Sequence, residues 1–298
     1  MITHFPQASS GASAEAVPAE LLIGREKLVN AVIDHVQDGR SVLLVEAAGM
    51  GKTAILHAVA QRMLPRRTSR TGLYCGEAGT LRKTLQSLAE GLYDRQRVLP
   101  AVTTGPRTGS RHTLARLPMG KLRRFVLPYL GAGRCMPLLD HLGSVRGTYA
   151  TFLDNLVEDL GVPIVVAARS LSPDDTGRLW WITWNFSKVD VAPLDHIHAQ
   201  RLIDSCLDRA RLRILDRQDF ARGVLKRADG NPRIITRLCE MAGSRRYQIH
   251  GRTNLRLLWL DFKILELGLG SHTGRDIPSD TNHPGTAQQC SGRGQSEP

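Results

Sequence analysis

One segment, residues 41 to 53, restricts the fold of this chain more than any other. The strand-like run Ser-Val-Leu-Leu-Val-Glu leads directly into Ala-Ala-Gly-Met-Gly-Lys-Thr, and an amphipathic helical pattern begins at once. A buried strand, a glycine-containing turn and a helix in this order form the context of a phosphate-binding loop. The sequence therefore predicts an α/β chain that binds a nucleoside triphosphate, ATP with Mg²⁺, at this loop.

The residue types of this loop each have a physical task. Glycine lets the backbone approach the phosphates, and the amides at the helix N-terminus point toward negative oxygens. Lys52 is expected to reach the β and γ phosphates, and the Thr53 hydroxyl to ligate Mg²⁺. The residues predicted to bind the nucleotide here are Glu46, Ala47, Ala48, Gly49, Met50, Gly51, Lys52, Thr53 and Ala54. Glu46 stands where the usual pattern has its first glycine, which leaves Gly49 and Gly51 to form the turn. The competing interpretation is a coincidental Gly-x-Gly-Lys-Thr turn.

Apolar runs of strand length alternate with longer amphipathic stretches along the chain. The strand-like runs are 41–46, 72–75, 135–139 and 163–167, and helical spacing covers 26–36, 52–63, 81–93, 149–160 and 199–211. Such alternation predicts the α/β fold of a P-loop NTPase, with a doubly wound parallel sheet covered by helices on both faces. From about 196 to 242 only helical patterns follow, which predicts a small C-terminal helical subdomain.

Composition sets the expected domain boundaries. Residues 1–19 and 270–298 are rich in small and polar residues and are predicted to be disordered. The predicted ATPase core covers 20–194 and contains a mobile loop at 100–120, where no apolar period is visible. A helical lid is expected at 195–245, followed by an apolar C-terminal helix within 246–269. No secretory signal or membrane span is recognisable, so we expect a cytoplasmic protein with no membrane partner.

An acidic residue at the end of a neighbouring strand is needed to hold the magnesium shell. Asp140 follows the apolar run 135–139 and is the predicted residue, although Pro137 removes a ladder donor from that strand. His141 stands where fast ATPases usually place a second carboxylate. An imidazole can accept a proton near neutral pH, so either hydrolysis or slow turnover with a switch function is consistent with this position.

Two arginines are candidates for contact with the γ phosphate. Arg169 follows the strand-like run 163–167, where a basic side chain can report whether that phosphate is present; an arginine simply leaving the sheet is the alternative. Arg233 lies in Gly230-Asn231-Pro232-Arg233, where Asn231 is a good helix cap and Pro232 suits the first turn. From a helix start, Arg233 can reach back toward the nucleotide.

Basic charge and aromatic residues suggest partners for the chain. The formal net charge of +12 favours polyanions, and basic loops are the predicted contact for DNA; solvated surface is the alternative for each basic cluster. Trp180, Trp181 and Trp184 lie next to Arg178 and Lys188 and could stack on bases. Because tryptophan is highly buried on average, we expect instead that they pack an edge strand or a subdomain seam. The five scattered cysteines are expected to be reduced, and Asp195-His196-Ile197-His198 to be structural rather than a metal site.

Taken in order, these motifs resemble those of the AAA+ and signal-transduction (STAND) P-loop ATPases, particularly origin-recognition-like and transposition-helper ATPases. Residues 47–53 resemble the Walker A loop, 138–140 Walker B, 168–170 the first sensor and 230–233 the second sensor of the helical lid. Ile23-Gly24-Arg25-Glu26 resembles the family's entry box. The resemblance implies that Gly24 and Arg25 lie against the adenine, that Pro232 and Arg233 belong to a lid that closes over ATP, and that closure is coupled to a partner or to assembly.

We therefore expect a regulated ATPase or nucleotide switch that acts on a macromolecule, with Lys52, Asp140, His141, Arg169 and Arg233 as its catalytic group. DNA, a protein partner and a second copy of the chain are the macromolecules to consider. The alternative, which His141 favours, is a non-hydrolysing module that binds a protein in a nucleotide-dependent way. A small-molecule kinase shares the phosphate loop but needs an acceptor site that the sequence does not show.

Overall fold

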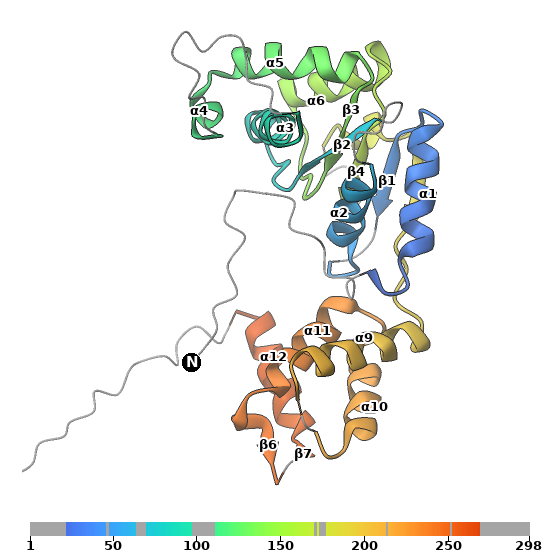
Figure 1. Cartoon of the computed structure of the whole chain (residues 1–298), viewed down its shortest axis with the longest axis vertical. Helices are drawn as coiled ribbons and strands as arrows, with labels where there is room; N and C mark the ends of the chain where they lie inside the picture. Colours follow the sequence, from blue (N-terminus) through green and yellow to red (C-terminus); the bar gives the residue numbers. More distant parts are fainter. Residues whose placement is uncertain are drawn as a thin grey trace, which may run out of the picture. The chain divides into compact units, whose positions relative to one another are not determined.

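The computed structural model describes residues 22–45, 48–63, 70–96, 111–169, 172, 177–212, 214–250 and 252–268. Figure 1 shows the chain with its helices and strands labelled. The chain divides into two compact units, Met1–Leu258 and Trp259–Pro298. The two ends predicted to be disordered lie outside the described residues, as do Glu46 and Ala47 of the predicted phosphate loop.

Five parallel strands form one sheet in the order β2-β3-β4-β1-β5. The strands are β1 (Val42–Val45), β2 (Thr71–Cys75), β3 (Cys135–Leu139), β4 (Val165–Ala168) and β5 (Ser187–Asp190). Because all five run in the same direction, the carboxyl ends of β1, β3 and β4 lie at one edge, where ligands bind in such sheets. The predicted doubly wound parallel sheet is confirmed.

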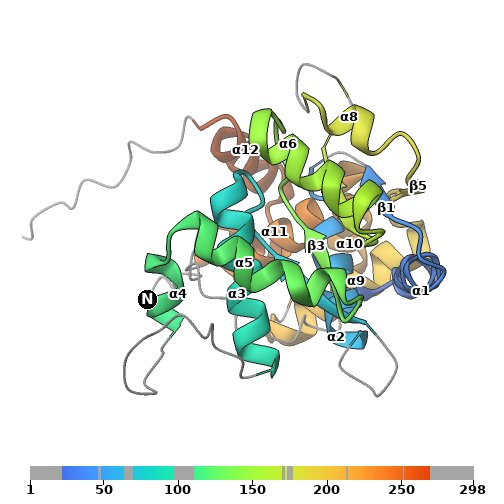
Figure 2. The same cartoon turned by 90° about the horizontal axis from the view of Figure 1, so that it is seen from above.

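Alternate residues of the central strands feed two separate apolar layers. Leu43, Leu139 and Val166 belong to one buried cluster, and Leu44, Leu138 and Val165 to the other. The first cluster is completed by helices α3 (Leu81–Gln96), α4 (Arg111–Arg116), α5 (Met119–Gly131) and α6 (Gly147–Asp154), the π-helical turn η2 (Asn155–Asp159) and α8 (Leu179–Ile182). The second is completed by α1 (Glu26–Gln37) and α2 (Lys52–Arg62), and Figure 2 shows both groups from above. Each face of the sheet is therefore covered by helices, as period-two burial requires.

Three local predictions need correction. Residues 100–110 of the expected loop lie outside the described residues, and 111–116 form α4, because Leu114 is buried in the first apolar layer and gives this helix a packing face. Strand β5 was not predicted, since Val189 is its one buried residue and it has no apolar run. The fourth strand begins at Val165 rather than 163.

Pro137 is accommodated inside the sheet rather than at its edge. It lies in β3 opposite Leu73 of β2, and the pairing of β3 with β4 begins one residue later, at Leu138. The register with β4 thus starts beyond the proline, which is how a central strand can tolerate a residue without an N–H group.

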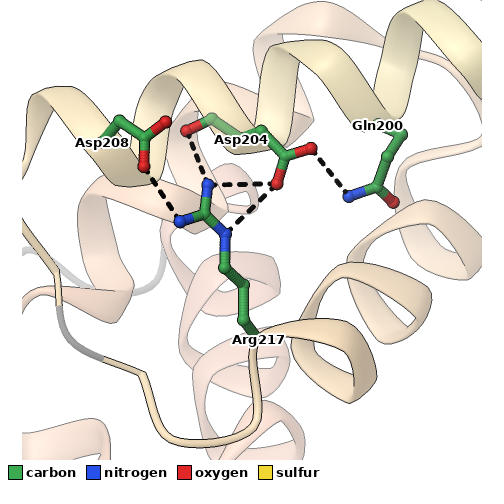
Figure 3. A network of polar contacts seen from close by, with 4 residues as sticks. All are labelled: Gln200, Asp204, Asp208 and Arg217. Carbon is green, nitrogen blue, oxygen red and sulfur yellow. Dashed lines mark hydrogen bonds and ion pairs between the residues drawn. The ribbon is translucent and has the colours of Figure 1, made fainter.

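Three helices make up the predicted helical segment: α9 (His196–Arg209), α10 (Arg217–Ala228) and α11 (Pro232–Ala242). Arg217 at the start of α10 donates to the carboxylates of Asp204 and Asp208 on α9, while Gln200 donates to Asp204 (Figure 3). The Arg217 side chain is 42% exposed, so this network orients the helices more than it stabilises them. The 3-10 turn η3 (Arg245–Tyr247) and a short hairpin of β6 (Gln248–Ile249) and β7 (Arg252–Thr253) follow α11.

Helix α12 (Leu255–Glu266) is close to the predicted C-terminal helix and crosses the boundary between the two units. Within the second unit, the rings of Trp259 and Phe262 stack at 5.3 Å, and the Lys263 ammonium lies 4.8 Å from the centre of the Trp259 ring. Among the described helices, none has the length and apolar character needed to span a membrane. Cys75, Cys135, Cys206 and Cys239 are buried free thiols, as predicted.

Candidate functional site

The segment predicted to be the phosphate loop lies between β1 and α2. Helix α2 begins at Lys52 and is preceded by Gly51, whose φ is 95°, while Gly49 has a φ of 90°. Both values lie in the left-handed region that residues with a Cβ rarely adopt. Among the described residues, no side chain caps the N-terminus of α2, and the amides at such a helix start can bind an anion. Thr53 and Ala54 lie in this first turn.

Three successive carbonyl oxygens of this loop accept hydrogen bonds from outside it. The Ala48 oxygen accepts from Asn231 Nδ2 at 3.2 Å, the Gly49 oxygen from the Arg233 amide at 3.3 Å, and the Met50 oxygen from an Arg25 Nη at 3.1 Å. In a trans peptide unit, the C=O and N–H bonds point in opposite directions. These contacts therefore turn the amides of Gly49, Met50 and Gly51 away from the groups that bind the carbonyls, in the manner of an anion-binding nest.

The start of α11 lies directly against the phosphate loop. Asn231 caps this helix, because its Oδ1 accepts from the amides of Arg233 at 3.0 Å and Ile234 at 3.3 Å. A Cβ at Gly49 would lie 2.7 Å from Asn231 Oδ1 and 2.9 Å from Arg233 Cβ, so the contact requires glycine. Pro232 is the first residue of α11, as predicted. The contact of Arg233 with the loop uses its main-chain amide, and its side chain is exposed.

Arg25 is a buried cation that joins three segments. Arg25 is only 4% exposed. One of its Nη atoms donates at 2.7 Å to the carbonyl of Ala192, a residue between β5 and α9, and the other donates to the carbonyl of Met50. Its Nε is buried and has no hydrogen-bond partner in the described part of the chain. Burial lowers the pKa of this guanidinium below its usual value. Arg25 thus links the entry box, the phosphate loop and the segment that leads into the helical subdomain.

Gly24 is required by a second close approach. Its φ is 71°, and a Cβ there would meet the ring of His198 at 2.8 Å. That ring is held by Asp195, which caps α9 by accepting from the His198 amide at 2.8 Å and lies 2.8 Å from His198 Nδ1. Together the capping bond and the ring contact lower the pKa of Asp195. His198 therefore fixes the start of α9 against the entry box, which agrees with a structural role for this histidine.

Asp140 lies at the end of β3, where the sequence places it, and is 2% exposed. Its Oδ2 accepts from the Tyr74 hydroxyl at 3.1 Å, and its Oδ1 accepts from the His141 amide at 2.8 Å. Its own main-chain amide donates to Cys75 at 2.9 Å, at the end of β2. The carboxylate is thus held in one orientation at the edge of the sheet.

Tyr74 and His57 connect Asp140 to the helix that follows the phosphate loop. The rings of Tyr74 and His57 lie 3.8 Å apart at 36°. Burial, and then the charge and hydrogen bond of Asp140, raise the pKa of Tyr74. Burial lowers the pKa of His57, and the charge of Asp140 offsets part of this effect. The sequence analysis missed both residues; the only available signal was a phenol inside an otherwise apolar strand.

His141 and Arg169 lie at the same edge of the sheet, each after its own strand. His141 has a φ of 52°, its side chain is 56% exposed, and its Nε2 lies 3.7 Å from Asp140 Oδ2, beyond hydrogen-bond range. Arg169 follows Ala168, which pairs with Val45 at the end of β1, and its side chain is exposed. Strand β4 lies between β1 and β3, so Arg169 emerges between the phosphate loop and Asp140.

The three tryptophans that were expected to be buried are exposed. Trp180, Trp181 and Trp184 are 42%, 65% and 68% exposed. The expectation was wrong because Leu179 and Ile182 supply the buried face of α8, and this leaves the tryptophans on the outside.

Solved structures share this fold at low sequence identity. A Walker-type ATPase of Pyrococcus abyssi matches with a TM-score of 0.56 and 14% identity, over 83% of this chain and 74% of that chain. The Orc1 protein of Aeropyrum pernix, solved in complex with DNA, matches with a TM-score of 0.50 and 16% identity. The match covers 82% of this chain and 64% of the Orc1 chain. No protein-family model matches, and no curated protein matches in sequence. The likeness confirms the predicted α/β fold, a parallel sheet with helices on both faces.

Proposed function

We propose that this chain, which has the fold of the AAA+ P-loop ATPases, binds ATP with Mg²⁺ at the phosphate loop and uses the helical subdomain as a lid that responds to the nucleotide. One observation carries the proposal: three successive loop carbonyls bind Asn231, Arg233 and Arg25, which turns the opposite amides toward the side where phosphate oxygens are proposed to bind. The same peptide units thus face the lid on one side and the anion site on the other.

The residues at the carboxyl edge of the sheet fit a magnesium nucleotide. Lys52 and Thr53 open α2, and Asp140 supplies a carboxylate whose two oxygens each accept one hydrogen bond and retain a further lone pair. Hydroxyl and carboxylate oxygens are the ligands that Mg²⁺ prefers, so Thr53 and Asp140 are the metal-binding residues of the proposal. Bound Mg²⁺ would neutralise charge on the phosphates.

The remaining residues take roles in binding and sensing. Gly24 and Arg25 form the side of the site nearest the lid, and Arg169 and Arg233 are the candidates for contact with the γ phosphate. His141 is the position that decides between a turning-over ATPase and a switch. Its imidazole is exposed and is not hydrogen-bonded to Asp140, so Asp140 does not orient it as a base, and slow hydrolysis is expected.

The partner is proposed to be a macromolecule, with DNA as the first to test. The net charge of +12 favours a polyanion, and the similarly folded Orc1 protein was solved with DNA. A non-hydrolysing module that binds a protein in a nucleotide-dependent way is the second candidate, because the position after Asp140 carries an imidazole and not a carboxylate.

The test measures ATP binding and ATP turnover separately. Binding of a fluorescent ATP analogue is titrated for the wild type, for Lys52→Ala and for Lys226→Ala, an exposed lysine on α10 that serves as a matched charge control. We expect Lys52→Ala to lose binding and Lys226→Ala to retain it. Failure of the wild type to bind would contradict the proposal.

Turnover is then measured with and without double-stranded DNA at low salt. Turnover that DNA raises and Lys52→Ala abolishes identifies a DNA-dependent ATPase. Tight binding without turnover identifies the switch.

A further inference from the structure

A group of exposed aromatic side chains lies outside the nucleotide site, on α8 and the turn after it. Trp180, Trp181 and Trp184 are all exposed, and the last two by 65% and 68%. We refer to these three residues as the tryptophan face. Tryptophan is among the most buried residue types on average, so three exposed tryptophans between positions 180 and 184 indicate an interaction site.

The tryptophan face is held in place by the core beneath it. Leu179 is fully buried and Ile182 is 7% exposed, and both belong to the apolar layer under α8. The buried Thr183 hydroxyl donates to the Leu179 carbonyl at 2.9 Å. The rings of Trp180 and Trp181 meet edge to face, 4.8 Å apart at 77°. Because its inner side is anchored, α8 presents these rings at little further cost in conformational entropy.

Two exposed arginines lie at the start of α8, next in the chain to the tryptophan face or against its first residues. The Arg178 amide donates to the Val145 carbonyl at 2.9 Å, and a Cβ on the neighbouring Gly177 would lie 3.4 Å from Arg146 Cγ. These contacts bring Arg146 to the same end of α8 as Arg178. Arg146 Nε donates to the Ser144 hydroxyl at 2.9 Å, and neither guanidinium pairs with a carboxylate in the part of the chain that the structure describes.

The exposed rings, the arginines and the net charge of +12 together select the class of ligand. From Gly177 to Lys188 the chain carries Arg178 and Lys188 and no acidic residue. Asp174 and Asp175 precede this stretch and lie outside the described residues, and Asp154 on α6, which packs against α8, and Asp190 on β5 are the acidic residues on neighbouring elements. Exposed rings close in the chain to Arg178 match a ligand that has flat apolar faces and negative charges. Single-stranded nucleic acid has both, whereas a duplex stacks its bases on each other.

We propose that the tryptophan face binds single-stranded nucleic acid, with bases stacked on Trp181 and Trp184 and phosphates beside Arg146 and Arg178. This inference rests on the proposed function in taking nucleic acid as the partner, and it adds the strand form and the surface. The tryptophan face shares no residue with the phosphate loop, so we expect the oligonucleotide to bind there in the absence of ATP.

The experiment measures fluorescence anisotropy of a labelled oligothymidine of about 16 nucleotides at low salt, a length suited to a surface of this kind. For the full-length protein we expect W181A/W184A to weaken binding at least about tenfold, and W181F/W184F to restore most of it, since phenylalanine retains a face for stacking. Arg178→Gln should make the slope of log affinity against log salt concentration shallower, by the amount that corresponds to the loss of about one phosphate contact. Arg222→Gln, a 77% exposed arginine on α10, removes one charge elsewhere and should leave affinity nearly unchanged.

Equal affinity of W181A/W184A and the wild type, or no binding by the wild type, would overturn the proposal. Equal losses for Arg178→Gln and Arg222→Gln would also overturn it, because binding would then follow net charge alone. Lys52→Ala should bind the oligonucleotide like the wild type, so failure of the nucleotide site and failure of the tryptophan face give different results. The substituted side chains are exposed, and an unchanged unfolding midpoint confirms that each variant folds.

Discussion

Asn231 makes two kinds of contact that substitution can separate. Its Oδ1 caps α11, and its Nδ2 donates to the Ala48 carbonyl of the phosphate loop at 3.2 Å. Replacing an asparagine N-cap with alanine costs about 1 kcal/mol of folding free energy. A hydrogen bond of this kind contributes about 1 kcal/mol more, so Asn231→Ala should lower the free energy of unfolding by about 2 kcal/mol.

Asn231→Ser is the matched variant, because serine caps helices about as well as asparagine and is too short to reach the loop carbonyl. It should retain the cap and lose only the contact with Ala48. The contact holds the loop in the conformation proposed to bind ATP, so in its absence ATP must order the loop itself, and a cost of about 1 kcal/mol weakens ATP binding about fivefold with little further change in the helices of the proposed lid. Asn231→Ala should show a similar loss of affinity and a larger loss of stability.

The assay combines urea unfolding, followed by circular dichroism, with titration of a fluorescent ATP analogue. The slope of the unfolding free energy against urea must be the same in all variants for the midpoints to be compared. The reasoning is refuted if Asn231→Ser matches the wild type in ATP affinity. It is also refuted if both variants lose the same stability, since the cap would then contribute nothing.

Three further outcomes test the site. Gly49→Ala should weaken ATP binding by about tenfold or more, because alanine is strained at a φ of 90° and its Cβ would press on Asn231; unchanged affinity would show that the lid and loop need not touch. Arg25→Lys keeps the positive charge but loses the planar guanidinium that donates to Ala192 and Met50 at once. The variant should therefore have a lower unfolding midpoint and a lower affinity for ATP. An unchanged midpoint would argue against Arg25 as a link between segments. Burial lowers the pKa of His57 below 6.5, so the unfolded chain takes up more protons than the folded chain as pH falls, and the stability of the fold declines below about pH 6.5. His57→Gln should therefore make the melting temperature less dependent on pH between about 7.5 and 5.5. An equal pH dependence in wild type and variant would show that other groups cause it.

The strands and helices around the phosphate loop could be predicted because each carries a continuous signal. β3 is buried along its whole length, so its apolar run and the position of Asp140 at its end were readable. α4 and β5 have few buried residues and gave no such run. Periodicity reports burial on one face of an element, and short elements held by one or two side chains fall below what it can detect.

The contacts between elements could not be read from the sequence in the same way. The bond from Tyr74 to Asp140 depends on the register of β2 and β3, which pairs Cys75 with Leu139. Likewise, a pattern that predicts Asn231 as a cap does not reveal that its amide reaches Ala48, 183 residues away. The tryptophans were assigned to the interior from their average burial, and only the packing of Leu179 beneath α8 shows that they face outward.

The proposed function separates nucleotide sensing from hydrolysis. If the loop binds phosphate through N–H, as proposed, its peptide units would be polarised in the same direction by the phosphate and by the residues that bind their C=O groups, so each contact would strengthen the other. Coupling of this kind is reciprocal, and a partner that holds the proposed lid closed must raise ATP affinity by the same factor that ATP raises affinity for the partner. Asp140 and His141 follow a different strand, β3, and take no part in the hydrogen bonds of the loop carbonyls. A chain with an imidazole in place of the usual carboxylate can therefore keep the switch intact while hydrolysis sets only how long the closed state lasts.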